Sequence, residues 1–535
     1  MKNDDNISTS NVGIVTIPCA EYEQMQGQIS AQEKQISVLE KQVELLTEAL
    51  RLSRQKRFGA SSERASEDAM EQLSLLFNEA EVYADQAAKE EDGSVTVAAH
   101  KRHKKHEYTL DHLPENVPVE VVEHRLPGEE LVCPECGNTM TEIGKEVRRR
   151  LKLEPPKVVV VEDRYYTYAC RKCEKEDIET PVVKAAMEPN FIPGSFATPE
   201  AVADLMVQKF VMGSPLYRQE NEFKRQGIPL KRQTMSNWLV WTSEQLLTPV
   251  CNQLHKELLK RAVLHADETT LQVLHEPGKT PQGKSYMWLY RTSGDTDRPI
   301  VLYEYQPDRK QEHPQEFLKG FRGYLHTDGY PGYHNLPEGI IVVGCWAHAR
   351  RKFDEAMKSL PKGKAKNSSA AQGLAYCNLL FKIEEGLAGL SPKERYDQRL
   401  KQSKSVLDAL LAWANTRAAA PKSALGRALT YLKDEWPYLL NYLKDGRLEL
   451  SNNRAERSIK PFVIDRKNFL FANTPSGATS SAVIFSLIQT AIENGLDPYR
   501  YLSWLMSTAA EMDLGQPENV QLLLPWNAPS KCRTN

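Results

Sequence analysis

The sequence predicts a multidomain α+β protein, and three observations lead to that prediction. The chain has 535 residues, more than a single hydrophobic core usually organises. Two Cys-x-x-Cys pairs mark a small segment in its first half. After residue 260, strand-like and helix-like stretches alternate in a way that is typical of a mixed sheet covered by helices. We therefore expect small N-terminal segments followed by a larger sheet-containing domain.

The composition excludes some classes of protein. Hydrophobic residues make up 41% and charged residues 26%, as in ordinary globular proteins. We expect a cytoplasmic protein, because no apolar stretch is long enough for a bilayer and the N-terminus lacks a signal-like apolar region. The 69 Lys and Arg residues nearly balance the 71 Asp and Glu residues, so binding to nucleic acid would depend on local basic patches.

Residues 20–58 are predicted to form a leucine-zipper-like coiled coil. Apolar residues recur at the a and d positions of a heptad: Ile29, Ile36, Leu39, Val43, Leu46 and Leu50. β-Branched residues at a with Leu at d favour a parallel two-stranded coil, so we expect a homodimer or higher oligomer. An amphipathic helix packed on its own domain is the alternative. Residues 59–110 have the composition of a flexible linker with a basic end.

Residues 111–185 are predicted to be a zinc-binding β segment. Four cysteines form two pairs separated by 33 residues: Cys133, Cys136, Cys170 and Cys173. The stretch 158–170 alternates like a strand, so two thiolate-bearing turns joined by β-structure would supply the four soft ligands of tetrahedral Zn²⁺. Four sulfurs leave no open position, so we expect this zinc to be structural. A redox role is the alternative, although redox pairs usually occur once.

Residues 190–250 are predicted to be helical, with a helix-turn-helix-like arrangement around Gly227. The helix after this break begins with Lys231 and Arg232, residue types suited to phosphates and base edges. A helical scaffold for the next domain is the alternative.

Residues 258–360 have the element order of a ribonuclease-H-like α/β core. The expected elements are strands at 261–267, 285–291 and 300–305, a helix at 314–320, strands at 323–328 and 340–346, and a helix at 347–357. In that fold the first and fourth strands are neighbours, so Asp267 and Asp328, at their ends, are expected to meet. Residues 361–448 are predicted to be a helical insertion, 449–495 to complete the core, and 496–535 to form a helical tail.

A third acid, Glu456, is expected on a short helix packed on this sheet, with Ser451, Asn452 or Asn453 as its cap. Two carboxylates about 4 Å apart repel by roughly 4 kcal/mol at an effective dielectric near 20, so a cluster of three requires cations. Oxygen ligands select Mg²⁺ or Mn²⁺, and two such ions suit in-line phosphoryl transfer. Each acid alone is more often structural, so the prediction rests on the strand order.

Two neighbours of these acids are not counted as ligands. Glu268 follows Asp267 in the strand and is expected to point to the opposite face. His348 is expected to be a helix-surface or core histidine, with a metal ligand or a contact to the scissile phosphate as the alternatives.

The residues around the acids resemble a known family. The matching stretches are RFGASSE (57–63), the two Cys-x-x-Cys pairs, SPLYRQE (214–220), HADET (265–269), HTDGYPGY (326–333), GCWAHARRKF (344–353), LSNNRAERSIKPFVIDRKNFLF (450–471), NGLDPYRYL (494–502) and LLPW (523–526). Over nearly its whole length the chain is similar to transposases of the insertion sequence 66 family. It departs from their usual pattern at His326 (commonly Gln), Ser451 (commonly acidic) and Lys460 (commonly Arg), and none of these changes removes an acid.

The resemblance implies a DDE transposase that binds the element's terminal inverted repeats and target DNA and performs Mg²⁺-dependent cleavage and strand transfer. It places the catalytic, metal-binding acids at Asp267, Asp328 and Glu456, and it implies small accessory proteins of the same element as partners. The alternatives are a nuclease that cuts without joining, and a zinc-containing DNA-binding regulator without catalysis.

Basic residues near these motifs suit a polyanionic substrate. The candidate DNA contacts are Lys231, Arg232, Arg350, Arg351, Lys352, Arg457, Lys460, Arg466 and Lys467. A solvated charged helix face is the alternative for each cluster.

Overall fold

The computed structural model describes Gln32 and residues 158–169, 182–187, 189–361 and 363–534. Residues 194–533 belong to one compact unit, and the described residues between 158 and 193 belong to another. Apart from Gln32, the predicted coiled coil lies outside the described residues, as do the predicted linker and the four cysteines of the predicted zinc site.

Within the unit that precedes residue 194, β1 (Thr167–Ala169) pairs antiparallel with β2 (Val182–Lys184). The predicted strand over 158–170 is wrong for 158–166, which have no regular secondary structure. Val159 and Val160 are 75% and 89% exposed, so the alternation of side chains there does not correspond to a buried face. A strand requires a hydrogen-bonded partner strand, and in the described part of this unit Thr167–Ala169 pair with β2, with one further backbone hydrogen bond from the Ala185 N–H to the Tyr166 carbonyl.

Helices precede the sheet in the larger unit: α4 (Pro199–Phe210), α5 (Leu216–Arg225), α6 (Arg232–Thr242), a π-helical stretch η3 (Ser243–Leu247) and α7 (Thr248–Leu258). The Thr198 side chain caps α4 by accepting a hydrogen bond from the Ala201 N–H. Gly227 turns the chain between α5 and α6 with a φ of +78°, a conformation that favours glycine. The predicted helices on both sides of this turn are confirmed.

A five-stranded mixed sheet forms the centre of the unit. Its strands, in spatial order, are β5 (Val301–Gln306), β4 (Lys284–Thr292), β3 (Val263–Gln272), β6 (Gly323–His326) and β7 (Ile340–Val343). Antiparallel pairing joins β5 to β4 and β4 to β3, whereas β3, β6 and β7 pair in parallel. The first and fourth strands of the sheet are therefore neighbours, as their order in the sequence predicted.

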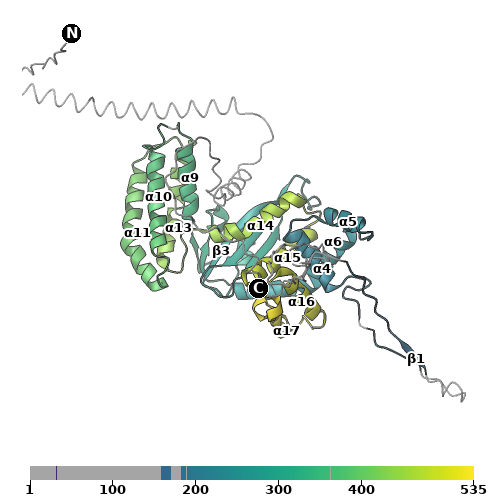
Figure 1. Ribbon diagram of the computed structural model, residues 1–535. Coiled ribbons are helices and arrows are strands. Elements are labelled where there is room, and N and C mark those ends of the chain that lie inside the picture. Colours follow the sequence, from purple (N-terminus) through teal and green to yellow (C-terminus); the bar gives the residue numbers. More distant parts are fainter. Residues whose placement is uncertain (1–31, 33–157, 170–181, 188, 362, 535) are drawn as a thin grey trace, which may run out of the picture. The chain divides into compact units, whose positions relative to one another are not determined.

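Helices cover both faces of this sheet: α8 (Glu312–Phe317), α14 (Asn453–Phe469) and α15 (Pro475–Glu493). On one face, the Tyr303 ring contacts Phe462 of α14 and Phe485 of α15. On the other, the Tyr290 ring stacks on Phe317 of α8 with centroids 3.8 Å apart. Figure 1 shows α14 beside β3, where it carries the third predicted acid across the sheet.

The predicted insertion is helical: α9 (Trp346–Lys358) leads into α10 (Ser369–Gly386), α11 (Pro392–Asn415), α12 (Ala424–Asp434), α13 (Trp436–Leu439) and the 3₁₀ turn η5 (Leu440–Lys444). In Figure 1, α9, α10 and α11 lie side by side. Phe353 of α9 and Trp413 of α11 share one hydrophobic core with Val263 of β3 and Val343 of β7. The insertion is thus packed onto the sheet. Its hydrophobic core already includes residues of α9, which lies before the predicted start of the insertion at residue 361.

The C-terminal residues complete the same unit with α16 (Pro498–Ala510), α17 (Pro517–Leu522), η6 (Pro525–Asn527) and η7 (Ser530–Cys532). α16 packs against α4, and the Phe210 ring contacts Phe485 of α15. The first and last helical segments of residues 194–533 are therefore in contact with each other and with α15, the helix that covers β5. Within the described ranges, no helix is long and apolar enough to cross a bilayer.

Candidate active site

Two similar tripeptides lie on neighbouring parallel strands, His265-Ala-Asp267 on β3 and His326-Thr-Asp328 at the end of β6. The register pairs His265 with His326, and each aspartate follows its histidine by two residues. Asp267 and Asp328 therefore occupy equivalent positions on the two chains, two residues after the paired histidines. The sequence predicts that Asp267 ends its strand, which is wrong: β3 continues to Gln272, because β4 pairs with it beyond the end of β6. Asp328 lies two residues past β6.

The two histidines form a stacked pair beneath these aspartates. Their ring centroids are 4.4 Å apart and their planes differ by 10°. Burial lowers the pKa of His265 to about 3 and that of His326 well below its ordinary value, so both rings are neutral at neutral pH. The His326 Nε2 accepts a hydrogen bond of 3.3 Å from the Glu449 N–H, and this contact brings the segment before α14 to the sheet.

Asn452 fastens the start of α14 to β3. Its side-chain Nδ2 donates to the Ala266 carbonyl at 2.8 Å, and its Oδ1 lies 2.9 Å from Nδ1 of His265. It is the N-terminal flanking residue of α14, but its side chain accepts no hydrogen bond from the helix, and α14 has 17 residues rather than being short. The Glu456 N–H donates to the Asn452 carbonyl, so Glu456 lies one turn after this anchor.

The three predicted acids influence one another. Asp267 is 9% exposed and Glu456 8% exposed. Burial raises the pKa of Asp267 well above its ordinary value, and the negative charges of Asp328, Glu268 and Glu456 raise it further. The Oε1 atom of Glu456 has no hydrogen-bond partner among the described residues. This concentration of carboxylates is therefore relieved either by a proton, as the raised pKa of Asp267 indicates, or by added positive charge.

Helix α9 presents two side chains to Glu456. Nδ1 of His348 lies 3.6 Å from Oε1 of Glu456, and Nη2 of Arg351 lies 3.5 Å from Oε2. Burial lowers the pKa of His348 to about 4. The sequence predicts a helix-surface or core histidine, and the ring is indeed largely buried; the structure adds that it lies against a candidate catalytic acid. The spacing of three residues between His348 and Arg351 puts both on one helix face, which is the signal that the sequence offered.

Glu268 is buried in a network behind the loop that carries Asp328. The Tyr333 hydroxyl donates to its Oε2 at 2.7 Å, and the Arg309 guanidinium donates to its Oε1. Arg309 lies 3.7 Å from the centroid of the Tyr330 ring, and the Tyr330 N–H donates to Oδ1 of Asp328. Burial, followed by the charge of Asp328, raises the pKa of Glu268 to about 7. Glu268 thus supports the loop of Asp328.

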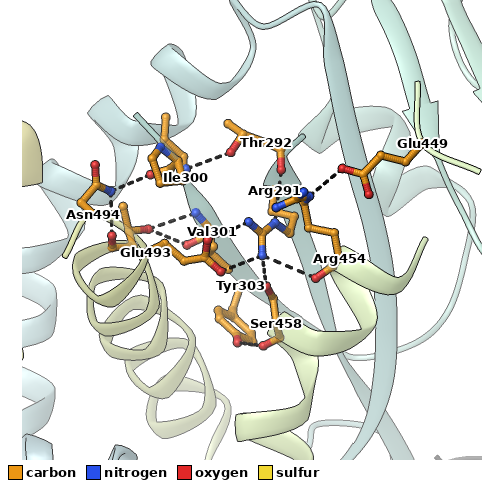
Figure 2. Close-up of polar contacts among 12 residues, drawn as sticks. Arg291, Thr292, Ile300, Val301, Tyr303, Glu449, Arg454, Ser458, Glu493 and Asn494 are labelled. Carbon is orange, nitrogen blue, oxygen red and sulfur yellow. Dashed lines mark hydrogen bonds and ion pairs between the residues drawn. The ribbon is translucent and has the colours of Figure 1, made fainter. Parts of the chain in front are cut away.

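Arg291 of β4 holds the middle of α14 and the end of α15 together (Figure 2). Its guanidinium is 2% exposed and forms two hydrogen bonds of 2.9 and 3.0 Å with the Glu493 carboxylate. It also donates to the Ser458 hydroxyl, while the Tyr303 hydroxyl donates to the Ser458 carbonyl. These contacts hold the part of α14 that follows Glu456 against the sheet. Glu456 therefore lies between two anchors, Asn452 before it and Ser458 after it.

Several basic side chains predicted to contact DNA are engaged within the protein. Arg466 donates to the hydroxyls of Thr269 and Thr270 at 3.1 and 2.9 Å, which ties α14 to β3. Arg350 donates to Asn378 at 2.6 Å, and Arg351 faces Glu456. These three arginines therefore have structural partners that compete with phosphate.

Of the remaining basic candidates, four are exposed and two are half-buried. Lys231, Arg232, Arg457 and Lys467 are exposed, and Lys231 and Arg232 lie at the start of α6. Glu220 contacts the backbone N–H of Arg232 and lies 3.9 Å from its guanidinium. Lys352 lies 5.0 Å from the centroid of the Tyr431 ring. Partial burial lowers the pKa of Lys460.

Comparison with known families defines the class of protein, a transposase that binds DNA. The chain belongs to the family described as Transposase IS66 family, whose match covers residues 194–480, more than half of the chain. The family resemblance of the sequence motifs is thereby confirmed. Residues 130–174, which contain all four cysteines of the two pairs, match the zinc-finger binding domain of transposase IS66. Residues 45–122 match a region described as Transposase C of IS166 homeodomain.

The chain is also similar to proteins of Sinorhizobium fredii (strain NBRC 101917 / NGR234). It is 30% identical to uncharacterized protein y4hP over 477 residues, which cover 85% of this chain and 82% of the relative. It is 31% identical to uncharacterized protein y4qI over 424 residues, which cover 76% of this chain and 75% of the relative. The similarity therefore extends well beyond the sheet domain.

Proposed function

We propose that this transposase cuts and joins DNA by metal-dependent phosphoryl transfer at Asp267, Asp328 and Glu456. The observation that carries the proposal is the pair of His-x-Asp tripeptides on neighbouring parallel strands, with Glu456 brought to the same place by the Asn452 anchor. The strand order of the sheet supports a ribonuclease-H-like core. Its substrates in this proposal are the terminal inverted repeats of the element and the target DNA.

The donor set fits Mg²⁺ or Mn²⁺. Asp267, Asp328 and Glu456 offer carboxylate oxygens, which hard divalent cations prefer. The pKa of Asp267 is raised, and Oε1 of Glu456 has no hydrogen-bond partner among the described residues; both are expected of a cation site without its cations. When bound, two such ions supply activation of the attacking oxygen and stabilisation of the leaving oxygen.

The protein's own side chains orient the acids and receive the DNA. Arg351 holds one oxygen of Glu456, and the Glu268 network holds the loop of Asp328. Exposed Arg457 and Lys467 lie on the helix that carries Glu456, where they can contact phosphates on either side of the reacting one. Lys231 and Arg232, at the start of α6, are proposed to contact DNA outside the active site.

The N-terminal segments complete the proposal. Cys133, Cys136, Cys170 and Cys173 hold a structural Zn²⁺, which the zinc-finger family match supports. Residues 20–58 join protomers through a coiled coil. The protein acts in the cytoplasm, at the nucleoid when bound to DNA, together with small accessory proteins of the same element.

The test uses the full-length protein, DNA that carries the element ends, and Mg²⁺. Cut and joined products are expected from the parent protein, and the rate of forming both should fall by about 1000-fold in Asp267→Asn, Asp328→Asn and Glu456→Gln. Asp354→Asn is the matched control, because Asp354 lies on α9 and its carboxylate forms an ion pair with Lys358, which is exposed. Cut products without joining would indicate a nuclease. Absence of cutting by the parent, with DNA binding unchanged in Asp267→Ala, would indicate a regulator.

A further inference from the structure

A second group of metal-ligating side chains lies beside the three acids. Cys345 precedes α9, His348 lies in its first turn, and Glu456 approaches from α14. One ligating atom from each residue lies within 4.8 Å of the others. This set combines a sulfur, a nitrogen and an oxygen donor, whereas Asp267, Asp328 and Glu456 together offer only carboxylate oxygens.

Two of these donor atoms are buried without a hydrogen-bond partner among the described residues. They are Nδ1 of His348 and Oε1 of Glu456, and they face each other across 3.6 Å. A buried polar atom without a partner costs about 1–3 kcal/mol. Two such atoms facing each other indicate a place for a third group that binds both. Arg351 occupies the neighbourhood of the other Glu456 oxygen, Oε2, so Oε1 remains the donor available to that group.

The third donor, Cys345, is fully buried and already held in place. Its Sγ accepts a hydrogen bond of 3.1 Å from the Asn452 N–H. Backbone N–H groups that point at a sulfur stabilise it as a thiolate and fix its direction, as outer-shell hydrogen bonds do in metal sites. Asn452 therefore supports Glu456 through the backbone and Cys345 through this contact.

We propose that Cys345, His348 and Glu456 bind a transition-metal ion of the Zn²⁺ or Co²⁺ type. Thiolate and imidazole donors select such ions over Mg²⁺, and three protein ligands leave a fourth tetrahedral position for water or a phosphate oxygen. Binding releases the thiol proton of Cys345 to solvent and forms the metal–sulfur bond in its place. Because Glu456 belongs to both groups, a metal held here withdraws Glu456 from the Mg²⁺ site proposed above.

The experiment adds Co²⁺ to the full-length protein that has first received one equivalent of Zn²⁺ per chain, the amount that the four thiolates of the zinc finger bind. The parent protein is expected to bind one further equivalent, with a sulfur-to-cobalt charge-transfer absorption. Cys345→Ser is expected to lose that absorption and to bind at least about 10–100-fold more weakly. The matched control is Cys377→Ser, which changes another fully buried cysteine, one that lies outside the proposed ligand set, and is expected to keep both.

Further variants define the ligand set. His348→Gln is expected to weaken the additional cobalt binding, and circular dichroism checks that each variant is folded. Asp267→Asn is expected to keep the absorption, because Asp267 is not a ligand of this ion. Equal absorption in the parent and Cys345→Ser, or no further equivalent in the parent, would overturn the proposal and leave only an ordered water between His348 and Glu456. The measurement needs neither DNA nor turnover, so its failure and a failure of DNA strand transfer are distinguishable.

Discussion

His265 on β3 and His326 on β6 stack ring against ring, with centroids 4.4 Å apart. The pair lies two residues before Asp267 and Asp328 and provides the surface on which the segment before α14 docks. The pair therefore joins the strands that lead to Asp267 and Asp328 to the segment that leads to Glu456. Side chains whose hydrogen bonds join this segment to the sheet should affect catalysis even though they do not touch substrate.

Asn452 is the first such side chain. Asn452→Ala removes the hydrogen bond to the Ala266 carbonyl and leaves that buried acceptor unpaired, so we expect about 1–3 kcal/mol less stability in urea unfolding. We also expect strand cleavage to slow by about 100-fold, because Glu456 loses its fixed position. Asn453→Ala is the control, since Asn453 is the exposed neighbour. Equal effects of the two substitutions would contradict the anchoring role.

Asp267→Asn should have opposite effects on stability and activity. Burial and the surrounding carboxylates disfavour the charged form of Asp267, so the neutral amide should raise the Tm of the metal-free protein at neutral pH. Cleavage should fall by about 1000-fold, equivalent to about 4 kcal/mol. Thermal denaturation with and without Mg²⁺ checks the reason: Mg²⁺ should raise the Tm of the parent protein and have much less effect on the variant.

The ion pair of Arg291 and Glu493 should contribute strongly to stability. Glu493→Ala leaves a buried guanidinium without its carboxylate, and the expected loss is about 3 kcal/mol of unfolding free energy. Arg225→Ala is the comparison, because it removes an exposed pair with Glu222 and should cost less than about 1 kcal/mol. Chemical denaturation of both variants measures the difference. Similar small losses would show that Ser458 and the Arg454 carbonyl suffice to hold Arg291.

Glu304 should give the protein a measurable pH dependence. Burial raises the pKa of its carboxyl to about 7, and its Oε2 has no hydrogen-bond partner among the described residues. The folded protein thus keeps this proton to a higher pH than the unfolded chain does. Its contribution to stability is most favourable below about pH 4.5 and declines as the pH rises to about 7.

Glu304→Gln should remove this decline. The variant is expected to be more stable than the parent at pH 8, by up to about 3 kcal/mol, and nearly equal to it at pH 4. Unfolding in urea at both pH values tests the prediction. Glu312→Gln is the control, because it makes the same change at an exposed glutamate. A constant difference between parent and variant across this range would contradict it.

The sequence by itself determined the strand order, the helical insertion and the identity of the three candidate acids. Hydrophobic periodicity is a local property, and the HADET, HTDGYPGY and NNRAERS motifs are contiguous, so both can be recognised without distant contacts. The adjacency of β3 and β6 followed from the strand order. The prediction for residues 158–166 was wrong, because alternation alone does not supply a strand with a partner.

The tertiary structure alone decided how these residues are held. β3 continues past Asp267 because β4 pairs with it to Gln272, which the residues of β3 do not encode locally. Asn452 binds the Ala266 carbonyl from 186 positions along the chain, and His348 reaches Glu456 only when α9 and α14 are packed. Such contacts depend on strand register and helix packing, which many distant residues set together, so a local pattern cannot specify them.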